Sequence, residues 1–346
     1  MAQFDIESKA SQPEPQQNNA KESPLKREFL AWWEVLILIL VLFITAFLIY
    51  FFFFIAKAKD QIFQPKVSSV ISSIFEIDEE VKESKSFDFS NYQSFLLLGI
   101  GGEGHAGGAL TDSIQVLVLN KYTKDAYLIS LPRDLYLKVG NCGEQKINTM
   151  FWCGEKTEAG GGAFSKNLVS YVLGIPIDYY VRMDFSGFRD LVNILGGLTI
   201  EVEKDFSDSM VSLYIPQGIH HLDGEIVLKY VRSRYTDSDF DRSRRQQQVI
   251  LAIKDKFLAA KIYLNPIKLY QLINILSQHL RTDIAYQDAI GLVSQFASIK
   301  IKNTYVIDNR KDNLLYNATQ GGAYILLPKA GDFSQIQEKV QQLLLE

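Results

Sequence analysis

The sequence contains little of what marks several protein classes. Two cysteines are too few for a disulfide-rich scaffold or a four-cysteine zinc site. Only four histidines are present, which makes a histidine-rich metal centre unexpected: His105, His220, His221 and His279. The formal net charge is −4 over 346 residues, so the overall charge gives no reason to expect nucleic-acid binding. We find no internal repeat.

The composition is that of a globular protein. Hydrophobic residues make up 47% and charged residues 22% of the chain, which excludes wholesale disorder and a collagen-like fibre. The length allows one large domain or two of average size. Residues 1–31 are rich in Gln, Asn, Ser, Pro, Lys and Glu, and we expect a disordered tail there.

One long apolar run, VLILILVLFITAFLIYFFFFIA, begins at Val35 and ends at Ala56. It carries no charge, glycine or proline, and as a helix it spans about 33 Å, enough to cross a bilayer. Trp32, Trp33 and Tyr50 suit the two membrane interfaces. We therefore predict a transmembrane helix over 32–56. Lysines and arginines flank it almost equally, so the positive-inside rule does not set its orientation.

The rest of the chain reads as a charged stalk over 57–90 and one domain over 91–346. Strand patterns alternate with helical ones, and SIQVLVLN and AYLISL, separated by a short polar turn, predict a hairpin. This order favours an α/β fold, an α-β-α sandwich with a central mixed sheet and helices on both faces. The expected strands are 94–100, 113–120, 126–131, 178–185, 198–203 and 303–308, and the expected helices are 162–174, 186–197, 242–260, two within 264–298 and one at the C-terminus.

A glycine-rich loop, GIGGEGHAGG, follows the first of these strands. Gly99, Gly101 and Gly104 satisfy the G-x-G-x-x-G spacing of dinucleotide-binding proteins, which requires a helix to begin at the loop. The next segment, ALTDSIQVLVLN, is instead a strand pattern, so we do not expect dinucleotide binding. A loop this rich in glycine either approaches a phosphate closely or is a mobile surface loop.

Five arginines fall within residues 232–245. Arg232 and Arg234 are two apart on a segment expected to be extended, where they share one face. Arg242, Arg245 and Gln246 are spaced i, i+3, i+4 at the start of a helix, where they share one stripe. Guanidinium groups bind phosphate oxygens in pairs, so this arrangement points to a compact anion such as a pyrophosphate.

Alternatives to an anion site remain open. Asp237, Asp239 and Asp241 are close enough in sequence to neutralise the arginines internally, and Asp239 or Asp241 is expected to cap the helix. Nucleic acid is another alternative, although few aromatic residues lie among the basic ones. Arg244 falls off the stripe and is expected to be a solvated surface residue.

Two more basic segments strengthen the anion reading. Arg133 directly follows the strand AYLISL, at the kind of strand end where ligand sites of α/β proteins cluster. Lys146 lies in an irregular stretch after it. Alone, each is more often a surface charge than a ligand contact, and together with the arginine group they favour a shared site.

Taken in order, these residues resemble the LytR–CpsA–Psr family of cell-envelope phosphotransferases. The resemblance covers about residues 93–260 strongly and the remainder more loosely. It implies a single-pass membrane protein, with the N-terminus cytoplasmic and the C-terminal domain outside. It also implies transfer of a glycopolymer from a polyprenyl-pyrophosphate glycolipid to a peptidoglycan acceptor, usually with Mg²⁺. The matching text is LLLGIGG, LTDSIQVLVLN, ISLPRDLYL, KINTMF, GIPIDYYVRMDFSGFRDLVNILGGLTIEVE and HLDGEIVLKYVRSRYTDSDFDRSRRQQQVI.

The resemblance also assigns roles by position. Asp112 matches a metal-associated aspartate, and Asp239 matches an acidic residue proposed to help catalysis, so Asp239, Arg232 and Arg234 form the expected catalytic set. Asp134 is the alternative base. Arg245 lies in the family's R-x-x-R-Q pattern and is counted as pyrophosphate-binding. The other positions that match pyrophosphate-binding residues are Arg133, Lys146, Arg232, Arg234, Arg242 and Gln246.

Two positions depart from the family pattern. Gly101 stands where an aspartate is common, and Leu110 stands where an arginine is common. One metal ligand and one phosphate contact are therefore missing from their usual places. Glu103 or His105 in the glycine loop is a candidate substitute ligand. Because of these departures, two other functions stay open: a non-catalytic binder or regulator of polyprenyl-pyrophosphate lipids, and a pyrophosphatase acting on them.

Two further expectations concern the surroundings of the site. Cys142 and Cys153 lie 11 residues apart, and outside the membrane a disulfide there would brace the segment of Lys146, the alternative being two buried thiols. The prenyl chain needs an apolar tunnel. Helical spacing offers residues for its wall, although the same spacing is more often plain core: Val249, Ile250, Ile253 and Phe257.

Overall fold

The computed structural model describes residues 45, 49–54, 56–57, 87–234, 238–259, 265–285, 288, 292, 295–296 and 298–346. Residues 1–54 and 55–346 form two separate units. The tail predicted over 1–31 lies outside the described residues, as do most of the predicted span over 32–56 and most of the predicted stalk over 57–90. Among the described residues, none of the helices combines the length and apolarity needed for a membrane crossing.

The larger unit is built on a six-stranded mixed sheet with strand order β11-β6-β1-β2-β3-β12. β1 runs antiparallel to β2 and parallel to β6, and β3 runs antiparallel to β2 and parallel to β12. The predicted hairpin is thus confirmed. The strands are β1 (Tyr92–Ile100), β2 (Thr111–Asn120), β3 (Asp125–Ser130), β6 (Tyr179–Asp184), β11 (Leu280–Thr282) and β12 (Lys300–Val306).

Alternate residues of the central strands enter two different apolar layers, because successive side chains of a strand point to opposite faces. On one face, Leu96, Val116 and Ile129 join the largest core cluster. On the other face, Phe95, Leu117 and Leu128 join a smaller cluster. Both faces are therefore buried, which explains why these strands read as almost continuous apolar runs.

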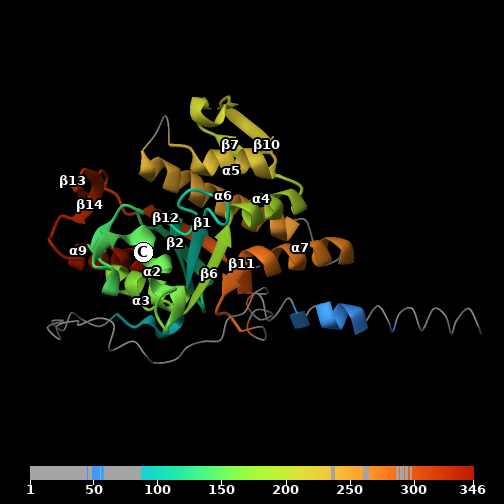
Figure 1. Ribbon diagram of the computed structural model, residues 1–346, viewed down its shortest axis with the longest axis horizontal. Helices are drawn as coiled ribbons and strands as arrows, with labels where there is room; N and C mark the ends of the chain where they lie inside the picture. Colours follow the sequence, from blue (N-terminus) through green and yellow to red (C-terminus); the bar gives the residue numbers. More distant parts are fainter. Residues whose placement is uncertain are drawn as a thin grey trace, which may run out of the picture. The chain divides into compact units, whose positions relative to one another are not determined.

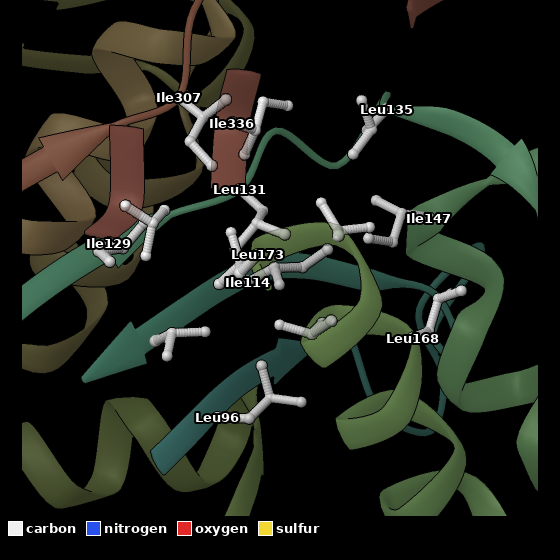
Figure 2. Close-up of a cluster of buried hydrophobic side chains, with 14 of the residues drawn as sticks. Leu96, Ile114, Ile129, Leu131, Leu135, Ile147, Leu168, Leu173, Ile307 and Ile336 are labelled. Carbon is white, nitrogen blue, oxygen red and sulfur yellow. The ribbon is translucent and has the colours of Figure 1, made fainter. Parts of the chain in front are cut away.

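The first face is covered by three helices, α2 (Met150–Gly154), α3 (Gly160–Leu173) and α9 (Ser334–Leu345). Leu168 and Leu173 of α3 are fully buried, and Figure 2 shows them among the sheet side chains Leu96, Ile114 and Ile129. Truncating such a leucine to alanine costs about 2–5 kcal/mol of stability. The helix ends at Gly174, whose φ of 67° is left-handed, as a C-terminal glycine requires.

The helices on the opposite face of the sheet are α4 (Phe185–Ile194), α5 (Gly224–Arg232), α6 (Asp239–Ala259) and α7 (Pro266–His279). Figure 1 shows α4, α5 and α6 on the side of the sheet away from α2 and α3. A separate apolar cluster joins α4, α5 and α6 to the hairpin of β7 (Leu198–Val202) and β10 (Gly218–Leu222). The predicted α/β architecture with helices on both faces is therefore confirmed.

Polar residues at helix starts explain where these helices begin. Asp184 accepts a hydrogen bond from the amide of Gly187 at the start of α4, and Asp223 accepts one from Ile226 at the start of α5. Before α6, the Ser238 hydroxyl accepts from the Asp241 amide at 3.2 Å while the Asp241 carboxylate accepts from the Ser238 amide. The expected cap was Asp239 or Asp241. The cap is Ser238, with Asp241 as its reciprocal partner.

Short elements absent from the sequence expectation complete the domain. Four short strands form two antiparallel pairs: β4 (Tyr136–Lys138) with β5 (Glu144–Lys146), and β8 (Phe206–Asp208) with β9 (Leu213–Ile215). A further hairpin, β13 (Leu315–Gln320) with β14 (Ala323–Pro328), precedes α9. The 3₁₀ turns are η2 (Phe89–Asn91), η3 (Gly140–Cys142), η4 (Ile147–Thr149) and η5 (Ser209–Val211). Most of the second helix expected within 264–298 lies outside the described residues.

Candidate functional site

A cavity of about 760 Å³ lies between the sheet and helices α4, α5 and α6. Its walls are apolar: Leu97, Val181 and Met183 come from the sheet, and Phe188 and Leu191 come from α4. A volume in this range is that of a small-molecule site with a mainly hydrophobic lining.

One stripe of α6 forms another wall of the cavity. Val249, Ile250 and Ile253 line it, in register with Arg242 and Gln246 one to three turns earlier on the same helix. The expected cavity lining is confirmed for these three apolar residues. Phe257 does not line the cavity and packs against the apolar cluster of α4, α5 and α6.

The polar rim of the cavity is made by the end of α5 and the start of α6. Arg232 is the last residue of α5, and Arg234 follows two residues later. The expectation of one extended segment was therefore wrong for Arg232, which is helical. Both arginines nevertheless line the cavity and are exposed to solvent. The Arg232 guanidinium lies 4.3 Å over the ring of Phe185, which fixes its direction.

Arg242, also on the rim, is almost completely buried. Its Nη2 lies 2.8 Å from Asp239 Oδ1 and donates to the Asp112 carbonyl at 3.2 Å. Asp239 thus neutralises one of the arginines, as the alternative of internal pairing anticipated. Asp237 lies outside the described residues, and Asp241 pairs with Arg244 instead.

Arg133 joins three carboxylates next to this rim. It forms an ion pair with Asp112, and its Nε lies 3.5 Å from Asp239 Oδ1 and 3.9 Å from Asp134 Oδ2. Lys146 Nζ lies 2.6 Å from Asp134 Oδ1. The structure therefore joins Arg133, Lys146, Asp112 and Asp239 to Arg242 of the rim in one network of alternating charges.

Asp239 is the most unusual group in this network. Burial raises the pKa of Asp239 above its ordinary value, and Asp134 and Asp112 raise it further, against the opposing effect of Arg242 and Arg133. Within the described part of the chain, neither carboxylate oxygen of Asp239 has a hydrogen-bond donor in good geometry. A buried carboxylate with unused acceptor capacity and a raised pKa has the properties of a general base.

Arg245 occupies a different environment from the other predicted arginines. It is buried, donates from Nε to the Tyr230 carbonyl at 3.0 Å and from Nη2 to the Ser233 carbonyl at 2.6 Å, and faces the Phe206 ring. It is not among the residues that line the cavity. The prediction that Arg245 binds pyrophosphate finds no support in this geometry, which gives it the task of holding the chain around Arg232 and Arg234.

Gln246 is placed on the rim as expected. Its side chain donates to the Val231 carbonyl and accepts from Gln115, both at 3.3 Å. Arg244 is half-exposed, as predicted, but it is not simply solvated. It pairs with Asp241 and, at 2.9 Å, with the buried Asp308 at the end of β12. These contacts tie the start of α6 to the sheet.

The glycine loop closes on itself between β1 and β2, with no helix at its end. The amide of Gly102 donates to the Gly108 carbonyl at 2.9 Å. A Cβ on Gly108 would lie 2.0 Å from the Gly102 carbonyl oxygen, so only glycine fits there. At Gly101 a Cβ would meet Gly108 Cα and His105 Cβ, each at 3.0 Å. A side chain at Gly101 would therefore contact the folded loop tightly, and the loop would have to shift by a few tenths of an ångström to admit it.

The loop also determines the surroundings of its two candidate ligands. Glu103 is exposed, and the His105 ring packs edge-on against Phe185 at 5.3 Å. Across the described residues, no group of three or more His, Cys, Asp or Glu side chains is arranged to hold a metal ion.

Two features of the site went unnoticed in the sequence. His279 Nδ1 lies 2.9 Å from Asp184 Oδ1, and Asp184 lines the cavity. β14 borders the charged network, because the Leu326 amide donates to the Asp134 carbonyl at 2.9 Å. In both cases the partners are far apart in sequence, so no local spacing could have revealed them.

Cys142 and Cys153 form a disulfide with their Cα atoms 6.2 Å apart, which confirms the expectation and excludes two free thiols. The bond joins η3 to α2 across the segment that carries Lys146. The loop that it closes contains Lys146, the ion-pair partner of Asp134.

Comparison with known proteins agrees with this geometry. The model of the LytR_cpsA_psr family matches residues 64–342. The chain is 33% identical over 235 residues to polyisoprenyl-teichoic acid–peptidoglycan teichoic acid transferase TagT of Bacillus subtilis (strain 168), a match that covers 64% of this chain and 70% of that protein. It is 32% identical over 246 residues to TagU of Enterococcus faecalis (strain ATCC 700802 / V583), with the same activity in its name, covering 68% and 77%.

A solved structure gives the same result for the fold. The protein YwtF (TagT) with bound octaprenyl pyrophosphate lipid superposes with a TM-score of 0.54 at 26% identity, covering 77% of this chain and 96% of that one. The family model matches most of the domain, and the match to each relative covers more than two thirds of that relative's length. The chain belongs to the LytR–CpsA–Psr family.

Proposed function

We propose that this protein is a phosphotransferase that moves a glycopolymer from a polyprenyl-pyrophosphate carrier to peptidoglycan. The observation that carries the proposal is the direct passage from an apolar cavity to a rim of arginines, since a prenyl pyrophosphate has the same sequence of an apolar chain and a compact anion. The names of TagT and TagU, and the octaprenyl pyrophosphate bound by YwtF, support it.

In the proposed reaction, a sugar hydroxyl of the acceptor attacks the phosphorus next to the glycan. A new P–O bond forms, the bond to the bridging oxygen breaks, and polyprenyl phosphate leaves with the electron pair. The hydroxyl proton passes to Asp239, whose raised pKa suits a base and whose oxygens accept no well-aligned hydrogen bond from the described residues. Asp134, already paired with Lys146 at 2.6 Å, is the weaker candidate.

The arginines act on the charge that develops on the two phosphates. Arg232 and Arg234 are exposed at the cavity mouth, where their guanidinium groups can bind the pyrophosphate oxygens. Arg133, Arg242 and Lys146 are linked to one another through Asp239 and Asp134. Cations fixed in advance stabilise such a transition state without having to reorganise.

Mg²⁺ fits the site only with help from the substrate. The ion often takes one or two protein carboxylates and completes its shell with water and phosphate oxygens. Asp112, which lines the cavity, meets that requirement, whereas a site made of protein ligands alone does not exist in the described residues. We propose that Asp112 holds Mg²⁺, which would supply positive charge to the phosphates.

We further propose a single-pass anchor over 32–56, with the N-terminus cytoplasmic and the domain outside. Its support is the uncharged run of 22 residues. Ile49, Tyr50, Phe52 and Phe53, in the helical stretch over 49–54, keep more than half of their surface exposed. Such side chains are stable when lipid covers them.

A second candidate function is binding of the lipid without transfer. The loop that fills the space beside Gly101, and Leu110 in place of an arginine, favour it, because both remove groups expected to act on the phosphates. In that case the arginine rim would hold the lipid as a sensor or carrier.

The test is a transfer assay with the full chain in detergent. It would be incubated with a synthetic polyprenyl-pyrophosphate disaccharide and peptidoglycan fragments, with Mg²⁺ or with EDTA, and the products read by mass spectrometry. We expect a phosphodiester-linked adduct that requires Mg²⁺. Free glycan phosphate would identify a pyrophosphatase, and lipid binding without either product would establish the binding function.

A further inference from the structure

The hairpin of β13 and β14, which carries no charged residue, lies beside the charged network. β14 is attached there by two contacts with the segment after β3: the Leu326 amide donates to the Asp134 carbonyl, and Leu135 and Leu326 form an isolated bridge. β13 and β14 therefore stand beside the carboxylates at a fixed position. Tyr324, two residues before Leu326 on β14, lies on the same face of that strand.

Three side chains on this surface are joined by hydrogen bonds. The Asn317 Oδ1 atom accepts from the Tyr324 hydroxyl at 3.0 Å and from Asn309 Nδ2 at 2.5 Å. In the hairpin register, Asn317 faces Leu326 and Tyr324 faces Thr319, so Asn317 and Tyr324 are diagonal neighbours on one face. Tyr324 keeps 44% of its surface exposed. An aromatic ring therefore stands at the surface with its hydroxyl held by the Asn317 amide, which Asn309 holds in turn.

The backbone contacts of Leu326 with Asp134 and Leu135 place this group next to the segment that carries Asp134. Burial raises the pKa of Tyr324, and the charges of Asp134 and Asp239 raise it further, which agrees with that placement. None of the three residues carries a charge itself, in contrast to everything around Asp239.

The chemistry of the group selects its ligand. The three side chains supply no cation, so they bind a phosphate more weakly than the arginines of the site do. A pyranose ring has an apolar C–H face that packs on an aromatic ring, and hydroxyls that both donate and accept. Asn side chains offer two donors and an acceptor, and a phenol offers one of each. The combination of one exposed ring and two amides matches a sugar.

We propose that Tyr324, Asn317 and Asn309 form a sugar subsite for the glycan that lies next to the reacting phosphate. This inference rests on the proposed function for the identity of the glycan. The bound sugar is either the first sugar of the donor or the acceptor sugar of peptidoglycan, since both sugars must meet at Asp239.

Kinetics of three variants of the full chain test the subsite. We expect Tyr324→Ala to raise the KM for one of the two glycans about tenfold, the equivalent of about 1.4 kcal/mol, with a smaller change in kcat. Tyr324→Phe keeps the ring and loses the hydroxyl, so it should show a smaller rise. Tyr316→Ala is the matched control, because Tyr316 is 46% exposed on the same hairpin and the opposite face from Asn317.

The arms of the assay separate the two sources of the sugar. A higher KM for peptidoglycan fragments assigns the subsite to the acceptor, and a higher KM for the disaccharide lipid assigns it to the donor. Affinity for octaprenyl pyrophosphate, which has no sugar, should not change in any variant. The proposal is overturned if Tyr324→Ala has the same KM for both glycans as the wild type and Tyr316→Ala.

The same variants also test the sugar subsite if the wild type shows no transfer. In that case the proposed transferase fails, and saturation-transfer NMR with peptidoglycan fragments, and separately with the disaccharide lipid, replaces the kinetics. Loss of the saturation signal in Tyr324→Ala alone would support a sugar subsite on a binding protein. An unchanged signal with both ligands would refute the subsite independently of the transfer reaction.

Discussion

The arginines within residues 232–245 fall into exposed and buried groups that the fold treats differently. Arg232 and Arg234 are exposed, and in the described part of the chain no carboxylate lies within ion-pair distance of either. Arg242 and Arg245 are buried and already hold protein partners, namely Asp239 and the carbonyls of α5 and Ser233. Arg245 uses its donors to fix the chain, whereas Arg242 lines the cavity and keeps an Nε that has no partner among the described residues. Residues of one type thus divide into scaffold and ligand-binding roles.

The exposed pair offers the sharpest test of this division. The double variant Arg232→Ala/Arg234→Ala should weaken binding of octaprenyl pyrophosphate about a thousandfold, since two charge-assisted contacts are worth about 4 kcal/mol together. Transfer should fall below detection. The free energy of unfolding should change by less than about 1 kcal/mol, because both side chains are solvated. Binding by fluorescence anisotropy and urea unfolding measure the two quantities, and undiminished binding would remove the basis for the pyrophosphate site.

For the buried group the expectation is reversed. Arg245→Ala should lower the free energy of unfolding by about 3 kcal/mol, because it leaves the carbonyls of Tyr230 and Ser233 without their donor and removes a cation from an aromatic contact. Arg244→Ala, at a half-exposed site on the same helix, is the matched control and should cost less. If Arg245→Ala unfolds normally in urea but loses lipid affinity, then Arg245 belongs to the ligand-binding group after all.

The carboxylate that holds Arg242 should behave as a titrating base. Asp239→Asn should reduce kcat about a hundredfold, the lower end of the usual range for a general base. In the wild type, kcat should fall as the pH drops through the pKa of Asp239, which burial raises, so this acidic limb lies above that of an ordinary aspartate. The residual activity of the Asn variant should show no such limb, and an identical profile would identify a different base.

The same substitution has a predictable effect on stability. Because the pKa of Asp239 is higher in the folded than in the unfolded state, its ionised form opposes folding, and stability from this group is lost as the pH rises through the folded pKa. Asp239→Asn should therefore be at least as stable as the wild type at neutral pH. Below about pH 3.9, the ordinary pKa of an aspartate, this difference should vanish. Thermal melts across pH show whether it does.

The disulfide should give the smallest of these effects. Cys142→Ser/Cys153→Ser should lower the free energy of unfolding by about 2 kcal/mol, since the bond closes a short loop in the unfolded chain. Lipid binding should weaken only slightly, because Lys146 keeps its contact with Asp134. Calorimetry and anisotropy measure both. A loss of binding as large as that of the double arginine variant would show that Lys146 depends on the disulfide for its position.

Much of the fold could be predicted because its signals are local. The strands of the sheet are buried on both faces and so appear as uninterrupted apolar runs, and α3 ends where a left-handed glycine stands. The hairpin of β13 and β14 was missed because LYNATQ has no apolar alternation and its stabilising partner is the distant Asp134. The cap of α6 was misassigned because the sequence offers Ser238, Asp239 and Asp241 so close together. In the structure Ser238 is the cap, and Asp241 is its reciprocal partner.

The sequence predicts which residues gather at the site, but it does not predict which of them face the cavity and which hold the chain in place. The spacing of Arg242, Gln246 and Val249 does place them on one stripe facing the cavity. Arg245 is equally close in sequence to that stripe, and only the position of the α5 carbonyls decides that it turns away. Likewise, no residue next to Tyr324 in the sequence indicates a site there. Its surroundings come from three separate segments, those of Asp134, Asn309 and Asn317.

The bond from Leu326 to Asp134 also constrains when the protein can work. A chain that emerges from its N-terminus first presents the arginines of the site, from Arg133 to Arg242, well before β14. The wall beside Asp134 is then completed only by β14. A chain that ends before β14 would keep the residues that line the cavity yet lack this wall, so the site becomes whole only once β14 has been made.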